Sequence, residues 1–240
     1  MPRSRASDVV SAMGPHTAQG GRIVDIGGQV DPVDDNTYEE DKALVVFAVD
    51  PGETTGWSAM KVPVARLVAE GATRTLPWCR WRHGEIRRSV PPGTGDMAQA
   101  VSDSQHVSLI LEQAAKIYAE FVYEPTEQEQ EEEGWESDEF VFVLERFGLR
   151  ILSMDTNLLA PVRVLDRLLD RMWCEESELP VFFHSSSEAM NTVTDERLRR
   201  WHMYDSGSGV HARDADRHAL LFVRRFSDSQ DLRSRLGFAI

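Results

Sequence analysis

The chain has 240 residues, enough for one sizeable hydrophobic core without requiring a second full domain. Its formal net charge of -14 argues against a protein that binds nucleic acid through generally basic surface. No apolar run reaches the roughly 18 residues that span a bilayer, and the N-terminus lacks the apolar segment of a signal peptide. The two cysteines, Cys79 and Cys174, have no metal-binding spacing, so we expect reduced thiols in a cytoplasmic protein that does not contact membranes.

Positive charge is concentrated toward the C-terminus. From Asp195 to Ile240 there are nine arginines and seven acidic residues, whereas the chain has only three lysines, none after Lys116. Arginine can pair with a phosphate through two parallel hydrogen bonds. A small arginine cluster can therefore bind DNA even in an acidic protein.

The first predicted strand follows a segment without regular structure. Residues 1–40 are rich in Gly, Ser, Asp and Pro and show no sustained period, which predicts a mobile N-terminal arm. Leu44–Asp50 is an apolar run of strand length that ends in an acid. The PGETTG segment after it has the composition of a turn, and two further strands are predicted at Trp57–Val62 and Trp78–Ile86.

Helical spacing appears in three later segments. Apolar residues recur on one helical face within Met97–Phe121, Pro161–Trp173 and Ala212–Phe226. A short strand is predicted at Val181–Phe183, and a helix is expected to begin near Thr194.

Two adjacent segments in the middle of the chain differ sharply in character. Residues 124–139 hold nine acidic residues and no basic one, which is typical of a solvated loop. Phe140–Glu145 is a second buried-type strand that ends in an acid. We therefore expect an α/β domain over residues 41–228, with an acidic loop at 124–139, followed by a C-terminal tail at 229–240.

Four polar residues occur at positions where a sheet can bring them together. Asp50 and Glu145 each end an apolar strand, and such strand ends meet at one edge of a parallel or mixed sheet. His211 and Asp214 stand three apart at the start of the last helix, so both project from one face. Alone, each residue is equally well explained as a turn former or a helix cap, and it is their order along the chain that indicates a site.

Three motifs in this order resemble those of RuvC-type Holliday-junction resolvases of the RNase H-like superfamily. They are DPGETTGWSAM at Asp50–Met60, VFVLERF at Val141–Phe147 and HARDADRHAL at His211–Leu220. The form of the last motif is most similar to the resolvase-like proteins encoded by tailed phages. The resemblance implies an RNase H-like fold, with a mixed central sheet and helices on both faces.

The resemblance also implies an activity, which is metal-dependent cutting of Holliday junctions or other branched DNA. Two Mg²⁺ or Mn²⁺ ions per site would promote phosphodiester hydrolysis. Asp50, Glu145, His211 and Asp214 would be both the catalytic residues and the metal ligands, with Asp50 shared between the ions and His211 ligating an ion or positioning the water. A homodimer that cuts opposed strands is implied, in the host cytoplasm if the protein is phage-encoded.

Contacts with DNA are expected from the turn after Asp50, from the segment after Glu145 and from arginines near the last motif. These residues are Thr54, Thr55, Arg146, Phe147, Arg150, Arg197, Arg200 and Arg213. Phe147 is expected either as a wedge between DNA strands or as a core residue. His218 lies one turn beyond Asp214, so we expect it to support the site or the core. The chain departs from the family at Met190, where a lysine is expected.

Two other functions remain open at this point. The chain could be a non-catalytic RNase H-like module that binds DNA or a protein, although clustered acids without a use are costly because they repel one another. It could also be an actin- or hexokinase-like ATPase, since D-x-G-x-T-T occurs in the phosphate loop of that fold. The sequence has no second glycine-rich phosphate loop and is short for two such lobes.

Overall fold

The computed structural model describes residues 22–25, 42–88, 95–122, 136–147, 159–174, 179–204 and 208–238. Most of the predicted N-terminal arm, the acidic run up to residue 135, and Arg150 lie outside these ranges.

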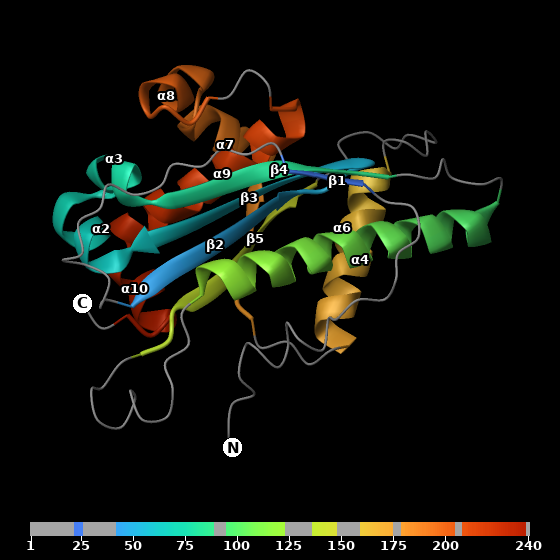
Figure 1. The fold of residues 1–240 in the computed structure, drawn as a ribbon, viewed down its shortest axis with the longest axis horizontal. Coiled ribbons are helices and arrows are strands. Elements are labelled where there is room, and N and C mark those ends of the chain that lie inside the picture. The colour runs from blue at the N-terminus through green and yellow to red at the C-terminus, as the bar shows by residue number, and fades with distance from the viewer. Residues whose placement is uncertain are drawn as a thin grey trace.

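The described strands form one six-stranded mixed sheet (Figure 1). In chain order they are β1 (Arg22–Asp25), β2 (Ala43–Asp50), β3 (Thr54–Pro63), β4 (Arg80–Arg87), β5 (Glu139–Arg146) and β6 (Val181–Ser185). Across the sheet the order is β1-β4-β3-β2-β5-β6. The β2–β5 and β5–β6 pairs are parallel, whereas β3 is antiparallel to both β2 and β4. From β4 to β6, β3 alone is therefore reversed, and the sheet is mixed, as the motifs implied.

Helices cover both faces of the sheet, and Figure 1 shows them in two layers. One face carries α4 (Asp96–Phe121) and α6 (Ala160–Cys174). The other carries α2 (Val64–Glu70), α7 (Ser186–Thr192), α8 (Asp195–Arg200), α9 (Val210–Asp228) and α10 (Gln230–Arg235). Two short helices, α3 (Ala72–Thr75) and η2 (Leu76–Trp78), lead into β4. The predicted α/β class, with a mixed central sheet and helices on both faces, is confirmed.

Strand β2 lies in the middle of the sheet and is buried along its whole length. Its alternate residues Val45, Phe47 and Val49 belong to the core under α4 and α6, and the intervening apolar residues belong to the core under α9. A strand covered on both faces needs apolar residues at every position, which is why Leu44–Asp50 reads as an unbroken apolar run.

The predicted core faces of the two longest helices are confirmed. On α4 the buried residues include the apolar positions Leu109, Ile110, Ala114, Ile117 and Phe121. On α9 they include Ala215, Ala219, Phe222, Val223 and Phe226. Within the parts of the chain that the structure describes, no helix combines the length and the apolar character needed to cross a membrane.

The two ends of the chain differ from the sequence prediction. Inside the predicted arm, β1 pairs with β4 at the sheet edge. The predicted C-terminal tail contains α10 and continues into the core, where Phe238 packs edge-on against Phe226 with ring centroids 5.2 Å apart. Leu236 is buried beside them. These segments are too short for a periodic pattern, so only their tertiary partners identify them as structured.

Removing the side chain of Phe226 tests whether α9 is held through this core. Phe226 is fully buried, so Phe226→Ala should lower the free energy of unfolding by about 3–5 kcal/mol, through lost burial and a residual cavity. Met97 is 79% exposed, so Met97→Ala should change the free energy of unfolding by less than about 0.5 kcal/mol. Urea denaturation of both variants gives the comparison, and equal midpoints would contradict this description of the core.

Candidate functional site

A single row of residues crosses the sheet at the end where β2 stops. Register pairs join Glu85 on β4 to Gly56 on β3, and Gly56 to Asp50 on β2. The parallel ladder between β2 and β5 then places Asp50 beside Glu145, and Glu145 pairs with His184 on β6. Residues in register point to the same face of a sheet. This row faces α9, because the apolar residues two positions earlier on β2 and β5 belong to the core under that helix.

Helix α9 lies against the row at its one position without a side chain, Gly56. A Cβ atom at Gly56 would lie 1.9 Å from the carbonyl oxygen of His211 and 2.8 Å from the amide nitrogen of Ala212. Helix and strand therefore meet backbone to backbone, which explains the glycine of the Thr-Gly pair in the first motif. The first turn of α9 is thereby brought over Asp50.

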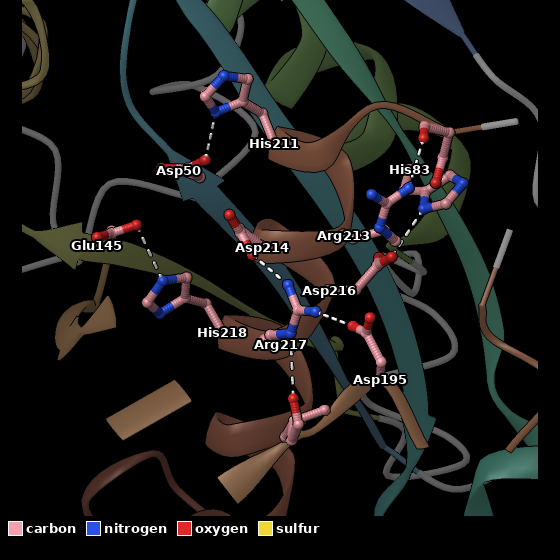
Figure 2. A network of polar contacts seen from close by, with 12 residues as sticks. Asp50, His83, Glu145, Asp195, His211, Arg213, Asp214, Asp216, Arg217 and His218 are labelled. Atoms are coloured by element: carbon pink, nitrogen blue, oxygen red, sulfur yellow. Dashed lines mark hydrogen bonds and ion pairs between the residues drawn. The ribbon is translucent and has the colours of Figure 1, made fainter. Parts of the chain in front are cut away.

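His211 contacts Asp50 directly. The ring nitrogen Nδ1 lies 2.8 Å from Asp50 Oδ2 (Figure 2). The pKa of Asp50 is raised to about 7: burial is the largest cause, the neighbouring Glu145 also raises it, and the contact with His211 opposes the shift. The same contact raises the pKa of His211. The two groups therefore titrate as a pair.

Glu145 has its own histidine partner. His218 is buried, and its Nε2 lies 3.3 Å from Glu145 Oε2. The His218 ring is stacked on His184, with centroids 6.1 Å apart. Burial raises the pKa of Glu145, but hydrogen bonds with His218 and Asp50 outweigh it, so the net shift is downward. His218, expected to support the site or the core, thus lies against one of the predicted site carboxylates.

Asp214, one turn after His211 on α9, is paired with Arg217. Arg217 also contacts Asp195 and donates from Nε to the carbonyl of Val193 at 3.1 Å. Burial raises the pKa of Asp214, Arg217 opposes the shift, and Glu145 adds to it. Glu145 therefore lies close enough to both Asp50 and Asp214 to raise their pKa values.

The structure therefore brings the four predicted site residues to one place, from three separate elements (Figure 2). Each of the carboxylates is engaged by a basic side chain: Asp50 by His211, Glu145 by His218, and Asp214 by Arg217. Among the residues that the structure describes, no three His, Cys, Asp or Glu side chains are already gathered around one point that could hold a metal ion.

Sequence reasoning missed Glu85, which lies at the end of the row. It is 2% exposed, and its carboxylate fills the space beside Gly209, where a Cβ atom would lie 1.5 Å from Glu85 Oε1. Gly209 precedes α9, whose first turn has no acidic residue and no side-chain cap. Glu85 therefore supplies the negative charge that stabilises this helix N-terminus. Strand β4 alternates polar and aromatic residues, a pattern that by itself resembles a solvent-facing strand.

Asp216 was also missed, and it anchors α9 to β4. It is fully buried, accepts a hydrogen bond from Trp81 Nε1 at 2.9 Å, and its Oδ2 lies 2.8 Å from His83 Nδ1. A buried carboxylate with two partners of this kind fixes the helix relative to the strand. In the sequence, Asp216 is only the second aspartate of a D-A-D segment. That pattern is equally consistent with an exposed residue.

Two residues of the turn after Asp50 have different surroundings. Thr55 is fully buried, and its hydroxyl lies 2.8 Å from His106 Nε2 and 3.2 Å from the backbone of Gly52. The predicted phosphate contact of Thr55 is therefore wrong for its side chain, because the turn folds inward onto α4. Thr54 is partly exposed.

The remaining predicted DNA contacts lie on both sides of the site. Arg146 is exposed at the end of β5, and the adjacent Phe147 is half-buried. Arg213 donates to the carbonyl of Ser208 at 2.7 Å. On α8, Arg197 bonds the carbonyl of Thr192, and Arg200 is exposed and pairs with Glu196 at 3.2 Å.

Comparison with known proteins gives structural likeness only. No protein-family model matches the chain, and no curated protein matches it. Similar solved structures include RuvC of Thermus thermophilus in complex with a Holliday junction substrate and a second Thermus thermophilus RuvC structure. Each match covers 81% of this chain, at 16% identity and a TM-score of 0.44, and covers 97% and 98% of the two RuvC chains respectively. Likeness at this level carries no argument about activity.

The close contact at Gly56 yields a first test of this site. In Gly56→Ala the new methyl group would meet backbone atoms of α9, which cannot rotate away, so the helix must move off the strand. We expect a loss of about 1–3 kcal/mol of stability in urea denaturation. Crystal structures of the wild type and of Gly56→Ala should show that His211 is displaced from Asp50 in the variant. An unchanged denaturation midpoint would show that α9 is not seated on this glycine.

The raised pKa of Asp50 yields a second test. A carboxyl group whose pKa is raised in the fold stabilises it fully below the unfolded pKa, and that stability is lost as pH rises through about 7. In EDTA, Asp50→Asn should therefore exceed wild type in melting temperature by more at pH 8 than at pH 5, with a difference of several degrees in order of magnitude at pH 8. Adding Mn²⁺ at pH 8 should raise the melting temperature of wild type more than that of the variant. A pH-independent difference would contradict the burial of this charge.

Proposed function

We propose that the chain is a divalent-metal-dependent endonuclease that cuts branched DNA, such as a Holliday junction. The observation that supports this most directly is the meeting of Asp50, Glu145 and Asp214 with His211 at one edge of the sheet. Glu145 raises the pKa values of both Asp50 and Asp214, so an added positive charge would stabilise the ionised carboxylates. Such a site favours a bound cation.

The donor chemistry of these residues fits a hard divalent ion. Carboxylate oxygens are the ligands that Mg²⁺ and Mn²⁺ prefer, and one imidazole is compatible with Mn²⁺. Asp50 and Glu145 would be the ligands from the sheet, with Asp214 and His211 from α9. When bound, the metal would activate water and stabilise the charge that develops on the phosphate.

The chain's own residues would prepare this site in three ways. The row across the sheet fixes Asp50 beside Glu145, so their charges are directed to the same space. His218 orients Glu145 from behind, in the manner of the hydrogen-bonded supports found around metal ligands. His211 keeps 46% of its side chain exposed, so its ring can contact a substrate or a water while it touches Asp50.

The proposed substrate is branched DNA, cut by a homodimer that presents two such sites. Exposed Arg146 at the end of β5 stands one residue after Glu145 and would contact a phosphate next to the cut. Labelled four-way, flap and linear DNA incubated with Mg²⁺ or Mn²⁺ and run on a denaturing gel would identify the preferred substrate. Light scattering would give the oligomeric state.

One observation favours a second function, a module that binds DNA without cutting it. Every carboxylate of the site is engaged by a basic side chain, as a purely structural network would require. The ATPase alternative has less support, because the described strands all belong to one sheet and that function required two lobes. The cutting assay separates the nuclease from the binding module.

Replacing the shared carboxylate tests the proposed chemistry. Asp50→Asn should lower the single-turnover rate of junction cleavage by at least about a hundredfold, because an amide is a poor metal ligand. Binding of the junction in EDTA should stay within about threefold, since backbone contacts and metal chemistry are separable. Asp228→Asn removes the same charge from the exposed end of α9 and should keep full activity. Wild-type rates in Asp50→Asn would exclude this residue from the chemistry.

The role of His211 can be read from the pH dependence of cutting at saturating Mg²⁺. A protonated imidazole can neither ligate a metal nor accept a proton. Activity should therefore fall as pH drops through the range in which His211 becomes protonated. His211→Asp should keep activity to lower pH, and His211→Ala should lose most activity. A parental profile in His211→Ala would make this residue a structural cap.

A further inference from the structure

The loop that follows Asp50 is closed by a threonine hydroxyl. The last register pair between β2 and β3 joins Asp50 to Gly56, and the loop lies between these two residues. Thr55 Oγ1 is 3.2 Å from both the amide nitrogen and the carbonyl oxygen of Gly52. The same hydroxyl is 2.8 Å from Nε2 of His106 on α4. One buried hydroxyl therefore joins both backbone groups of Gly52 to the helix that covers the face opposite α9.

The hydrogen-bonding roles in this contact follow from the protonation state of the imidazole. The pKa of His106 is lowered to about 4: burial is the largest cause, and Arg88 also lowers it. A hydrogen bond with the backbone of Gly52 and the charge of Asp103 oppose the shift. The ring is therefore neutral near pH 7 and carries one N–H group. Because buried Nδ1 has no hydrogen-bond partner among the described residues, the proton belongs on Nε2, which donates it to Thr55.

This arrangement uses every hydrogen-bonding group of the Thr55 hydroxyl. Oγ1 accepts from His106 Nε2 and from the Gly52 amide, and it donates its own proton to the Gly52 carbonyl. His106 is 1% exposed and lies next to the core residues Val107 and Ile110 of α4. An apolar side chain would fill such a position without the cost of burying a polar ring. The hydrogen bond to Thr55 is therefore the physical reason for a histidine here.

The contact holds β3 at a point that α9 contacts from the other face. Thr55 faces the same side of the sheet as Trp57 and Ala59, which belong to the core under α4. The next residue, Gly56, meets the backbone of α9. Two consecutive residues thus fix β3 from both faces, and the second of them is the register partner of Asp50.

We propose that His106 is a positioning residue for the cleavage reaction, acting through Thr55 on the loop that follows Asp50. This inference rests on the proposed function. Asp50 can serve as a shared metal ligand only if its backbone is held in place, because a displacement of about 1 Å can cost about a hundredfold in rate. His106 touches neither the substrate nor the reacting atoms, and it fixes the loop before DNA binds.

The first test measures the loop in the free protein, in EDTA and without DNA. Thr55→Val keeps the shape of the side chain but removes the hydroxyl that accepts from the Gly52 amide. Exchange of that amide hydrogen with solvent should become at least about tenfold faster. His106→Leu should accelerate the same exchange, because Thr55 loses its partner. His106→Gln carries an N–H donor near the position of Nε2 and should restore most of the protection.

The second test measures single-turnover cleavage of a labelled four-way junction at saturating Mg²⁺. His106→Leu and Thr55→Val should each lower the rate by about ten- to a hundredfold. Junction binding in EDTA should stay within about threefold of wild type, because both side chains are buried away from DNA. The double variant should be no slower than the slower single variant, since both changes remove one contact. His106→Gln should cut within about fivefold of wild type.

Thr75→Val is the matched control. Thr75 is also fully buried, and its hydroxyl donates to a glycine carbonyl, that of Gly71, at 3.0 Å. It lies in the short helices that lead into β4. Thr75→Val should lower the melting temperature as the loop variants do, but it should leave cleavage and the exchange of the Gly52 amide unchanged. Equal slowing of cleavage by Thr75→Val would overturn the proposal, because general loss of stability would then explain the effect.

Melting temperatures establish which variants are folded, and Thr55→Val decides the question if His106→Leu is unfolded. Wild-type cleavage in a folded variant that lacks the contact would overturn the proposal. So would unchanged exchange at Gly52, or a His106→Gln variant as slow as His106→Leu. A wild-type protein that cuts no junction would refute the proposed nuclease, and the positioning role with it. A wild-type protein that cuts, with cutting unaltered in these variants, would refute the role of His106 alone.

Discussion

The backbone contact between α9 and β3 at Gly56 is the constraint on which the site depends. Only at a residue without a Cβ atom can the first turn of a helix sit directly on a strand in the middle of a sheet. That contact sets the height and rotation of α9, so His211 meets Asp50 and Asp214 faces the same space. The buried Asp216 anchors the helix further along, and Glu85 stabilises its N-terminus.

The same contact concentrates negative charge in a poorly solvated place. Burial raises the pKa values of Asp50 and Asp214, and their proximity to Glu145 adds to both shifts. Three basic side chains offset part of the cost of burying these charged carboxylates: His211, His218 and Arg217. A carboxylate buried without such a partner would bear the full desolvation cost of its charge.

An acidic protein can present positive charge locally, and this chain does so with arginine. On the α4 and α6 side of the sheet, a buried carboxylate holds Arg88, Arg163 and Arg167 beside the turn that follows β2. On the other side, the last helices carry nine arginines. Net charge describes long-range attraction, whereas affinity for a phosphate depends on guanidinium groups fixed within hydrogen-bonding distance.

The amino-acid sequence by itself determined the elements with long apolar periods and the residues at their ends. The two apolar strands that end at Asp50 and Glu145, and the helix that starts with His211 and Asp214, follow from local patterns, as do the core faces of α4 and α9. Tertiary structure alone decided the partners of these residues. His211 and Asp50 are 161 positions apart, and no local pattern relates them.

The same reason accounts for what the sequence left out. Glu85 became part of the site through strand register, Thr55 was buried by α4, and Asp103 gathered arginines from β4 and α6. Burial and pairing of a polar residue are properties of its neighbours in space, so an isolated Glu, Thr or Asp in a sequence carries no sign of them.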